Sequence, residues 1–243
     1  MSATVELGLE TATDRLSVAV RGPGGEMLEE AVEGARRHAA ALVPLVDRLV
    51  RLVGGGPAGV GLVAVAEGPG SFTGLRVGAA VAKAIALAGP VPMWSAPSLL
   101  VRAAGIAAAG ETVLAVSAAL RGELFIGAWE FHADGSITER LPPRARAAPQ
   151  FAELLPPVDR ACGDGPAELL AAISRQVGRP VLGPPVAHPS AATLLRLVGV
   201  PGGAVQISSP AQWEPVYGRP AEAQAQWERR HGRAFPDSGR SPG

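Results

Sequence analysis

Apolar and polar positions alternate at the start of the chain, which is the pattern of short β-strands. Residues 5–10 and 16–20 are predicted to form two strands joined by a polar turn. A glycine-rich stretch, residues 22–25, ends the second strand. A third strand over residues 27–32 would complete an antiparallel meander.

The apolar period then changes to that of a helix. Between residues 36 and 53 the apolar residues recur at helical spacing, and Pro44 predicts a local kink because it removes a hydrogen bond from the ladder. Residues 62–66 are almost continuously apolar, which is typical of a strand buried on both faces. A glycine-rich segment and an alanine-rich helix to about residue 88 follow. Strand, glycine turn and helix in this order predict a β-turn-α unit.

The second half of the chain has its own strand and helix patterns. After a short strand around residues 93–94, strands are predicted over residues 112–117 and 124–131. Residues 141–149 are rich in proline, arginine and alanine and are predicted to form a surface loop. Residues 187–197 are a candidate helix.

These patterns predict two lobes. We expect an N-terminal lobe over residues 1–97 and a C-terminal lobe over residues 98–210. A helix near residues 211–228 is expected to return to the first lobe. Residues 229–243 are polar and are predicted to form a disordered tail.

Composition narrows the class of protein. Hydrophobic residues make up 47% and charged residues 18%, which indicates a globular chain. The formal net charge is +0, from 22 Lys and Arg against 22 Asp and Glu, which argues against a chain that grips nucleic acid alone. Cys162 is the only cysteine, so no internal disulfide can form. Without a signal-peptide pattern or a long apolar stretch, we expect a cytoplasmic protein with no membrane span.

The most distinctive segment is GPGSFTGLR, residues 68–76. Its glycines permit a tight strand-to-helix turn, and Ser71 is a good N-cap for the helix that follows. The residues alone leave three interpretations open: a structural turn, a phosphate site at the exposed helix amides, or a helix-packing surface along Gly74, Gly78 and Ala82. The spacing fits neither a Walker loop nor a Rossmann fingerprint.

Two turns carry candidate chemistry for a nucleotide site. In the first hairpin turn, a carboxylate and two hydroxyls could hold a metal-bound phosphate, or could form an ordinary polar turn. A later Gly-Asp-Gly triplet could line an adenosine pocket, or be a plain turn. The corresponding second-lobe turn, residues 117–122, has no carboxylate, so half of such a site is missing. The candidate residues are Glu10, Thr11, Thr13, Gly163, Asp164 and Gly165.

The sequence does not indicate a metal or a nucleophilic site. His38, near the start of the first long helix, has no second ligand three or four residues away, and the other histidines are scattered. No serine–histidine or cysteine–histidine pairing is indicated by the local sequence. We therefore expect no bound metal and no covalent chemistry of the chain's own.

Several segments together resemble the TsaB (YeaZ) family, which is related to the M22 glycoproteases. The resemblance covers the hairpin turn at residues 10–13, the helix start at residues 37–44, and a late segment at residues 214–220 with a Pro-x-Tyr-x-Arg pattern. It is strongest over roughly the first hundred residues, and its most specific part is the glycine motif. The motif residues are Gly68, Pro69, Gly70, Ser71, Phe72, Thr73 and Gly74.

The resemblance implies an α/β fold with two lobes, the actin-like ATPase (ASKHA, RNase H-like) fold, with mixed sheets flanked by helices. It implies a non-catalytic scaffold that supports a catalytic TsaD-type paralogue, with a TsaE-type ATPase, in adding threonylcarbamoyl to the adenosine next to the tRNA anticodon. The tRNA would be met through the complex, and the chain alone could form a homodimer. The implied pairing surface lies on the first two helices: His38, Leu42, Pro44, Leu45, Thr73, Arg76, Gly78 and Ala82.

Alternatives from other classes are a glycoprotease-like peptidase and an ATP-binding, kinase-like enzyme of the same superfold. No nucleophile or metal cluster supports the peptidase. Ala118 and Leu120 stand where the family commonly has Asp and Arg, and Glu10 stands where it often has Asp. These changes remove metal and phosphate contacts, so we expect no cofactor and at most weak binding of ATP or ADP.

Overall fold

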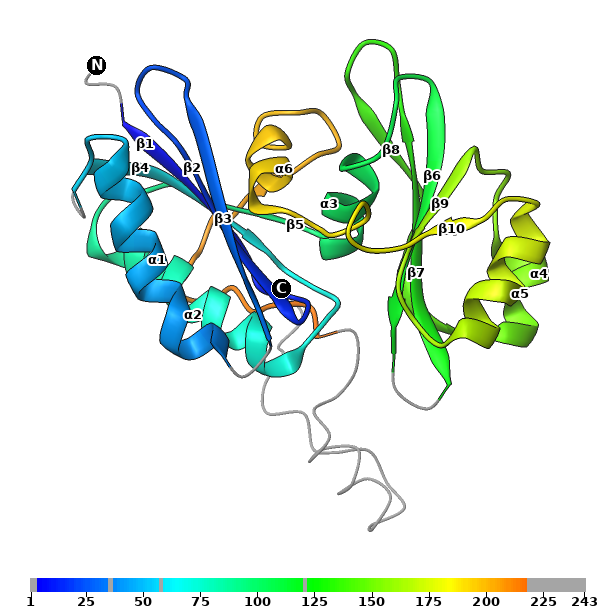
Figure 1. Cartoon of the computed structure of the whole chain (residues 1–243). Coiled ribbons are helices and arrows are strands. Elements are labelled where there is room, and N and C mark those ends of the chain that lie inside the picture. The colour runs from blue at the N-terminus through cyan, green and yellow to red at the C-terminus, as the bar shows by residue number, and fades with distance from the viewer. Residues whose placement is uncertain (1–3, 35–36, 57–58, 120–121, 218–243) are drawn as a thin grey trace.

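The computed structural model describes residues 4–34, 37–56, 59–119 and 122–217, which form two α/β lobes side by side (Figure 1). Each lobe is built on one mixed β-sheet. Residues 211–217 contain no helix. The rest of the predicted helix near 211–228 and the predicted tail at 229–243 lie outside the described residues.

The first sheet confirms the predicted meander and the buried strand that follows it. Its first three strands pair antiparallel, and the next two run parallel to the first. The order across the sheet is β11-β5-β4-β1-β2-β3. The strands are β1 (Val5–Glu10), β2 (Arg15–Arg21), β3 (Met27–Glu33), β4 (Val60–Ala66), β5 (Met93–Ala96) and β11 (Val205–Gln206).

The second sheet repeats the topology of the first. Three antiparallel strands are again followed by two strands parallel to the first of them, in the order β10-β9-β6-β7-β8. The chain therefore has the two-lobed actin-like ATPase (ASKHA) fold, with an RNase H-like sheet in each lobe. The strands are β6 (Glu111–Ala118), β7 (Glu123–Phe131), β8 (Ile137–Ala147), β9 (Arg160–Gly163) and β10 (Val181–Leu182).

Helices cover the outer face of each sheet and fill the space between the sheets (Figure 1). On the first sheet, α1 (His38–Leu52) and α2 (Phe72–Ala88) form the outer layer. On the second sheet, α4 (Phe151–Leu154), which follows a 3₁₀ turn, and α5 (Ala167–Val177) form it. Two short helices, α3 (Ser98–Ala104) and α6 (Ala191–Arg196), lie between the lobes.

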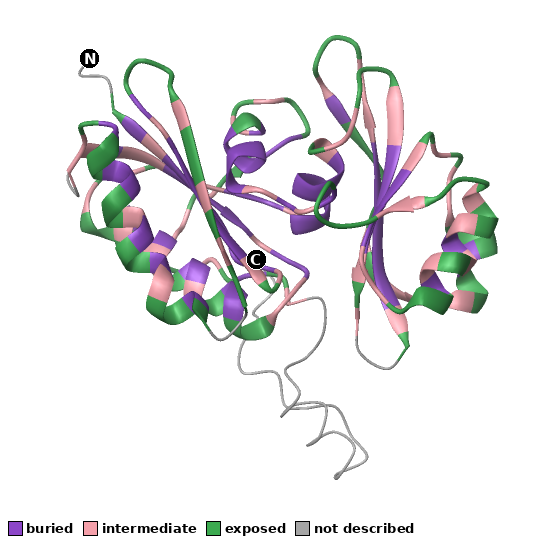
Figure 2. Ribbon diagram, in the orientation of Figure 1, coloured by how far each residue is buried: buried purple, intermediate pink, exposed green. Residues whose placement is uncertain are grey.

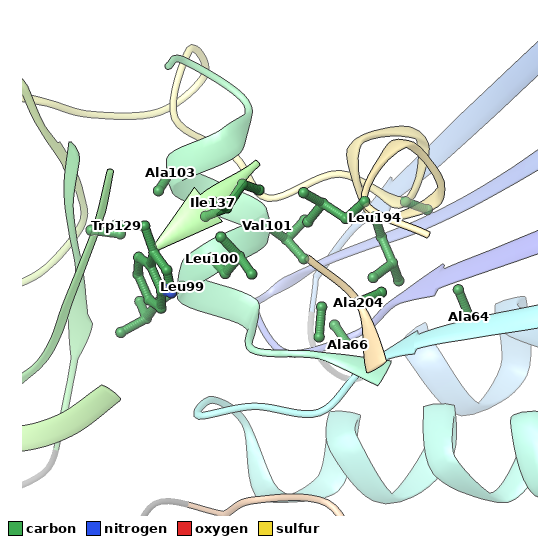
Figure 3. Packing of buried hydrophobic residues seen from close by; sticks show 14 of the residues in the cluster. Ala64, Ala66, Leu99, Leu100, Val101, Ala103, Trp129, Ile137, Leu194 and Ala204 are labelled. Atoms are coloured by element: carbon green, nitrogen blue, oxygen red, sulfur yellow. The ribbon is translucent and has the colours of Figure 1, made fainter. Parts of the chain in front are cut away.

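The core is continuous from one lobe to the other. In α1 the buried Leu42, Leu45 and Leu49 recur at helical spacing and face the first sheet. Between the lobes, one apolar cluster joins Ala64 of β4 to Trp129 of β7 through α3 and α6 (Figure 3). Figure 2 shows the same pattern, with buried residues concentrated in both sheets and in the two central helices. Burial of this apolar layer holds the lobes together.

One predicted loop is a strand. Residues 141–149 were expected to form a surface loop, but β8 continues to Ala147. Proline is tolerated there because β8 is the edge strand of its sheet, where an amide hydrogen can be missing without breaking a ladder bond. The pairing of β7 with β8 also shifts register between Ile126 and Ala128, opposite Pro142 and Pro143, which is the behaviour of a β-bulge.

The chain returns to the first sheet earlier than the sequence predicted. Strand β11 pairs antiparallel with β5, with Val205 opposite Ser95, although this segment was expected in the second lobe. Helix α6 also packs on β1, β2 and β4 of the first sheet. It is shorter than the predicted helix at 187–197 because Ser190 caps it, accepting a hydrogen bond from the amide of Thr193.

Candidate functional site

The glycine motif forms the turn between β4 and α2. Gly68 has φ +105°, and a Cβ there would lie 2.2 Å from the carbonyl oxygen of Val216. Both facts require glycine. Ser71 caps α2, because its Oγ accepts a hydrogen bond from the Gly74 amide at 3.2 Å. The prediction of an N-cap at this serine is confirmed.

The row of small residues on α2 packs against the chain's own first hairpin turn. A Cβ at Gly70 would lie 2.2 Å from the Ala12 carbonyl oxygen, and one at Gly74 would lie 2.1 Å from the Thr11 carbonyl oxygen. A Cβ at Gly78 would lie 2.4 Å from the Thr11 hydroxyl. The glycines therefore let the turn between β1 and β2 approach the helix closely, and this face of α2 is covered.

The late segment, residues 214–217 in the described part of the chain, lies against the glycine motif. The Val216 amide donates to the Glu67 carbonyl at 2.7 Å, and the Tyr217 ring lies 4.7 Å from the Phe72 ring. An ion pair of 2.9 Å joins Glu214 to Lys83 of α2. Two segments that both carry the sequence resemblance therefore meet at the start of α2. Gly218, Arg219 and Pro220 lie outside the described residues.

The eight residues predicted for a pairing surface divide into two groups. Pro44, Thr73 and Arg76 are exposed, and the Arg76 guanidinium lies 5.3 Å from the centre of the Phe72 ring. The other five are buried within the first lobe and are not on its outer surface. These five are His38, Leu42, Leu45, Gly78 and Ala82. The pairing role of all eight stays a prediction.

Sequence reasoning gave no interface role to the apolar side chains that reach solvent on α1 and α2, although it named Phe72 as part of the glycine motif. They are large and well exposed: Val43 at 57%, Leu52 at 62%, Phe72 at 41% and Leu87 at 59%. The helical period marks the apolar face that meets the sheet, so single apolar residues on the opposite face carry no signal in one sequence. All four belong to the two helices that form the outer layer of the first lobe.

A second polar group of residues begins with Glu10 at the end of β1. Its side chain is fully buried, and its Oε1 accepts a hydrogen bond of 2.7 Å from the Ala12 amide. Burial raises the pKa of the Glu10 carboxyl to about 7, while that hydrogen bond and the charges of Arg102 and Arg15 act in the opposite direction. Glu10 can therefore hold or release a proton near neutral pH.

Asp164, in the turn after β9, pairs with the same arginine. Arg102 of α3, only 1% exposed, places Nη2 at 2.5 Å from Asp164 Oδ2. Asp164 Oδ1 accepts longer hydrogen bonds from the Ser117 hydroxyl and the Ala118 amide, at 3.5 and 3.4 Å. Of the residues predicted for a nucleotide site, Asp164 pairs directly with the Arg102 guanidinium, and Glu10 is affected by its charge. Sequence reasoning missed Arg102, which no local motif marks.

The remaining residues predicted for a nucleotide site play structural parts. Thr11 packs against Gly78 of α2, and the Thr13 hydroxyl donates to the Arg15 carbonyl at 3.1 Å. Both glycines of the Gly-Asp-Gly triplet have positive φ values, +143° at Gly163 and +158° at Gly165. A nucleotide site at these residues stays a prediction.

Two further titratable side chains, Cys162 and His188, have shifted pKa values. Burial raises the pKa of the Cys162 thiol to about 12, so it is protonated at neutral pH and is a poor nucleophile. Burial and then the charge of Arg15 lower the pKa of His188. Within residues 4–217, apart from the short undescribed gaps, no group of three or more His, Cys, Asp or Glu could hold a metal ion. No helix in the same part of the chain is long and apolar enough to span a membrane.

Comparison with known proteins gives consistent similarities. A family model described as TsaD, tRNA N6-adenosine threonylcarbamoyltransferase, matches residues 30–136. The tRNA threonylcarbamoyladenosine biosynthesis protein TsaB of Escherichia coli is 31% identical over 99 residues, which cover 41% of this chain and 42% of that protein. TsaB of Haemophilus influenzae is 37% identical over 89 residues, 36% of each chain. These matches span less than half the length of the curated relatives.

The structural similarity extends further along the chain than the sequence matches do. YeaZ from Pseudomonas aeruginosa superposes with a TM-score of 0.70 at 27% identity, covering 88% of this chain and 99% of that one. Both lobes are therefore shared with that protein.

Proposed function

Because the chain belongs to the TsaB (YeaZ) family, we propose that it is a non-catalytic subunit of the machinery that makes threonylcarbamoyladenosine in tRNA. In this proposal it docks on a catalytic TsaD-type paralogue and supports its activity, with a TsaE-type ATPase as a further partner. The tRNA is met through the complex. The names of the related proteins support the reaction, and the surface of the first lobe supports the role of docking partner.

The observation that carries the proposal is the apolar outer layer of the first lobe. Val43 of α1 and Phe72 and Leu87 of α2 each expose about half of their surface. Exposed apolar groups on a helical layer are typical of a protein interface. Arg76 beside the Phe72 ring adds a residue type that is enriched at the centres of interfaces. This layer also contains the three exposed residues of the predicted pairing surface, so we propose it as the docking surface.

The similarity to the TsaD model supports the choice of partner. The match over residues 30–136 includes both α1 and α2, so a TsaD-type protein has segments similar to the proposed docking surface. Two related chains can then pair through like surfaces, as in an isologous dimer. The same argument makes a homodimer the competing assembly when the chain is alone.

The protonated, buried thiol of Cys162 favours a non-catalytic role for the chain. Cys162 is fully buried and its thiol stays protonated at neutral pH. We propose that the chain needs no metal and no nucleotide of its own, and that it acts in the cytoplasm.

Reconstitution tests the proposal directly. Purified paralogue, ATPase, tRNA and substrates are assayed with and without this chain, and modified nucleoside is measured by mass spectrometry after tRNA digestion. We expect modification to depend on this chain and to persist when Cys162→Ala replaces the wild type. Equal modification without the chain would overturn the supporting role, and loss of modification in the Cys162→Ala protein would indicate catalysis by the chain itself.

A further inference from the structure

The loop that follows α6 is anchored to the first lobe on both sides. At the start of α6, the Ala191 amide donates to the buried Ser17 hydroxyl of β2 at 3.0 Å. Near the end of α6, Arg21 Nη2, also of β2, donates to the Leu195 carbonyl at 3.3 Å. Strand β11 then pairs with β5 of the same sheet. Residues 198–204, which join α6 to β11, therefore leave the first sheet and return to it.

The tip of this loop contacts the second lobe. The Ile137 amide, at the start of β8, donates to the Pro201 carbonyl at 2.8 Å. The backbones are closer still at the next residue, because a Cβ at Gly202 would lie 1.8 Å from the Ile137 carbonyl oxygen. Ile137 also belongs to the apolar cluster between the lobes, together with Leu194 of α6 (Figure 3). The loop thus joins the first lobe to the edge strand of the second sheet.

The covalent links between the lobes leave a rotation free. The chain crosses between the sheets twice, from β5 into α3 at Pro97 and from β10 into α6 over residues 183–190. Lobes joined by such links can rotate about them, as lobes that close around a ligand do. The apolar cluster opposes separation of the lobes, but apolar burial is non-directional and lets surfaces slide. A hydrogen bond is directional, so a further contact of this kind can fix the angle.

The loop contact lies apart from the second of these links. Ile137 pairs with Phe131, which pairs with Glu111, the first residue of β6. Strands β6, β9 and β10 run parallel, and the link over residues 183–190 leaves the last residue of β10, Leu182. The loop therefore holds the second sheet at the amino-terminal end of its parallel strands, whereas the link leaves from their carboxyl-terminal end.

We propose that residues 198–204 are a brace that fixes the angle between the two lobes, so that the chain behaves as one rigid body and its lobes do not open and close. The brace acts through the backbone of Pro201 and Gly202 on the start of β8. This proposal goes beyond the proposed function and does not depend on it. A braced chain presents both lobes to any partner at one set angle.

The distance between the lobes in the isolated full-length chain tests the brace. Spin labels are attached at Ala40→Cys on α1 and Gln176→Cys on α5, exposed positions on the outer layers of the two lobes. Cys162 is fully buried and should take up no label. Pulsed electron paramagnetic resonance then measures the distribution of label distances. We expect one narrow distribution with the wild-type loop, and a broader or shifted one after Gly202→Ala, because the added Cβ pushes the loop off β8.

Gly199→Ala is the matched control. Gly199 and Gly202 lie in the same loop with φ +77° and +76°, so alanine is strained by its backbone at both positions. A Cβ at Gly199, however, would have no atom beyond its chain neighbours within 4 Å. We expect this variant to keep the wild-type distance distribution. The same broadening in both variants would mean that strain within the loop causes it, and would overturn the proposal.

Hydrogen–deuterium exchange followed by NMR shows whether the contact is broken. Exchange of the Ile137 amide should be about 5-fold faster in the Gly202→Ala protein and unchanged in the Gly199→Ala protein. Faster exchange with an unchanged distance distribution would overturn the proposal, because the lobes would keep their angle without the brace.

A second variant covers the case in which Gly202→Ala does not fold or leaves the Ile137 exchange unchanged. Deletion of Pro201 and Gly202, both exposed at the loop tip, removes the same contact without introducing a clash. The same broadening or shift is expected, and a wild-type distribution in this variant would overturn the proposal. Neither measurement needs a partner protein, so failure of the brace is distinct from failure of the proposed function.

Discussion

Strand β1 of the first lobe and strand β6 of the second occupy the same place in their sheets, yet they end differently. At the end of β1, the Glu10 side chain is fully buried. At the end of β6, Ala118 offers only its backbone amide, which donates to Asp164. Shared topology fixes where a strand ends, but the side chain there decides whether the end can carry charge. Only the first lobe keeps a carboxyl group at this position.

The outer helical layers of the two lobes differ in how many large apolar side chains they expose. In the first lobe, α1 and α2 expose four large apolar side chains: Val43, Leu52, Phe72 and Leu87. In the second lobe, Leu154 is the one exposed large apolar residue among the described residues of α4 and α5. The two lobes thus share one framework, but among the described residues the outer helices of the first expose more large apolar side chains than those of the second.

The close approach of α2 to its hairpin turn should give the largest effect on stability. A Cβ at Gly74 would lie 2.1 Å from the Thr11 carbonyl oxygen. Because that oxygen belongs to the backbone, the whole turn would have to move to make room. We expect Gly74→Ala to lower the free energy of unfolding by about 3 kcal/mol. Chemical denaturation measures it. Gly183→Ala in the second lobe, where a Cβ would meet only an atom 3.9 Å away, should have little effect. Similar losses in both variants would contradict the account.

The buried carboxyl at the end of β1 should make stability depend on pH. Burial raises the pKa of Glu10 from 4.5 to about 7, so the folded state binds the proton more tightly than the unfolded chain. Stability contributed by this group is fully present below 4.5 and is lost as the pH rises to about 7. In the Glu10→Gln protein, the fall in the free energy of unfolding over this pH range should be smaller by about 2 kcal/mol.

Urea denaturation across this pH range, comparing the wild type with Glu10→Gln, measures the effect. Glu139→Gln, an exposed carboxylate substitution on β8 of the second lobe, is the control. The loss should remain in that protein because Glu10 is still present. A loss of the same size in the Glu10→Gln protein would show that another group causes it.

The two outer helices also start differently, which gives a smaller effect. The Ser71 hydroxyl caps α2, whereas α5 starts after Pro166 with no side-chain cap. Ser71→Ala should lower the free energy of unfolding by about 1 kcal/mol. Ser71→Thr should retain most of the stabilisation because a threonine hydroxyl can also cap the helix. Thermal unfolding measures both. If Ser71→Ala matches the wild type, the hydrogen bond to Gly74 does not stabilise the helix.

Strong periodic patterns account for what the sequence predicted correctly. The meander, α1, β4 and α2 all have clear alternation or helical spacing, and Ser71 has the residue type of a cap. Helix α3 was missed because it is short and its residues from Ser98 to Ala103 are all buried, so it shows no polar face. β8 was missed because two prolines obscured an edge strand.

The candidate sites were harder to predict because they depend on contacts between distant segments. Arg102 meets Asp164, 62 residues further along the chain, only after the chain has folded, so no local spacing marks it. The buried faces of α1 and α2 were included in the predicted pairing surface because resemblance transfers positions and not exposure. Leu42 and Ala82, for example, both lie in the core of the first lobe.

Binding to a TsaD-type paralogue, measured by isothermal titration calorimetry, tests the asymmetry between the lobes most directly. Phe72→Asp on α2 and Leu154→Asp on α4 replace apolar residues of similar exposure, 41% and 36%, and the first sits at a helix start where a carboxylate is favoured. We expect the wild type to bind, Phe72→Asp to weaken binding about 30-fold, equivalent to about 2 kcal/mol, and Leu154→Asp to leave it unchanged. Equal affinity of the two variants, or no binding by the wild type, would contradict docking through the first lobe.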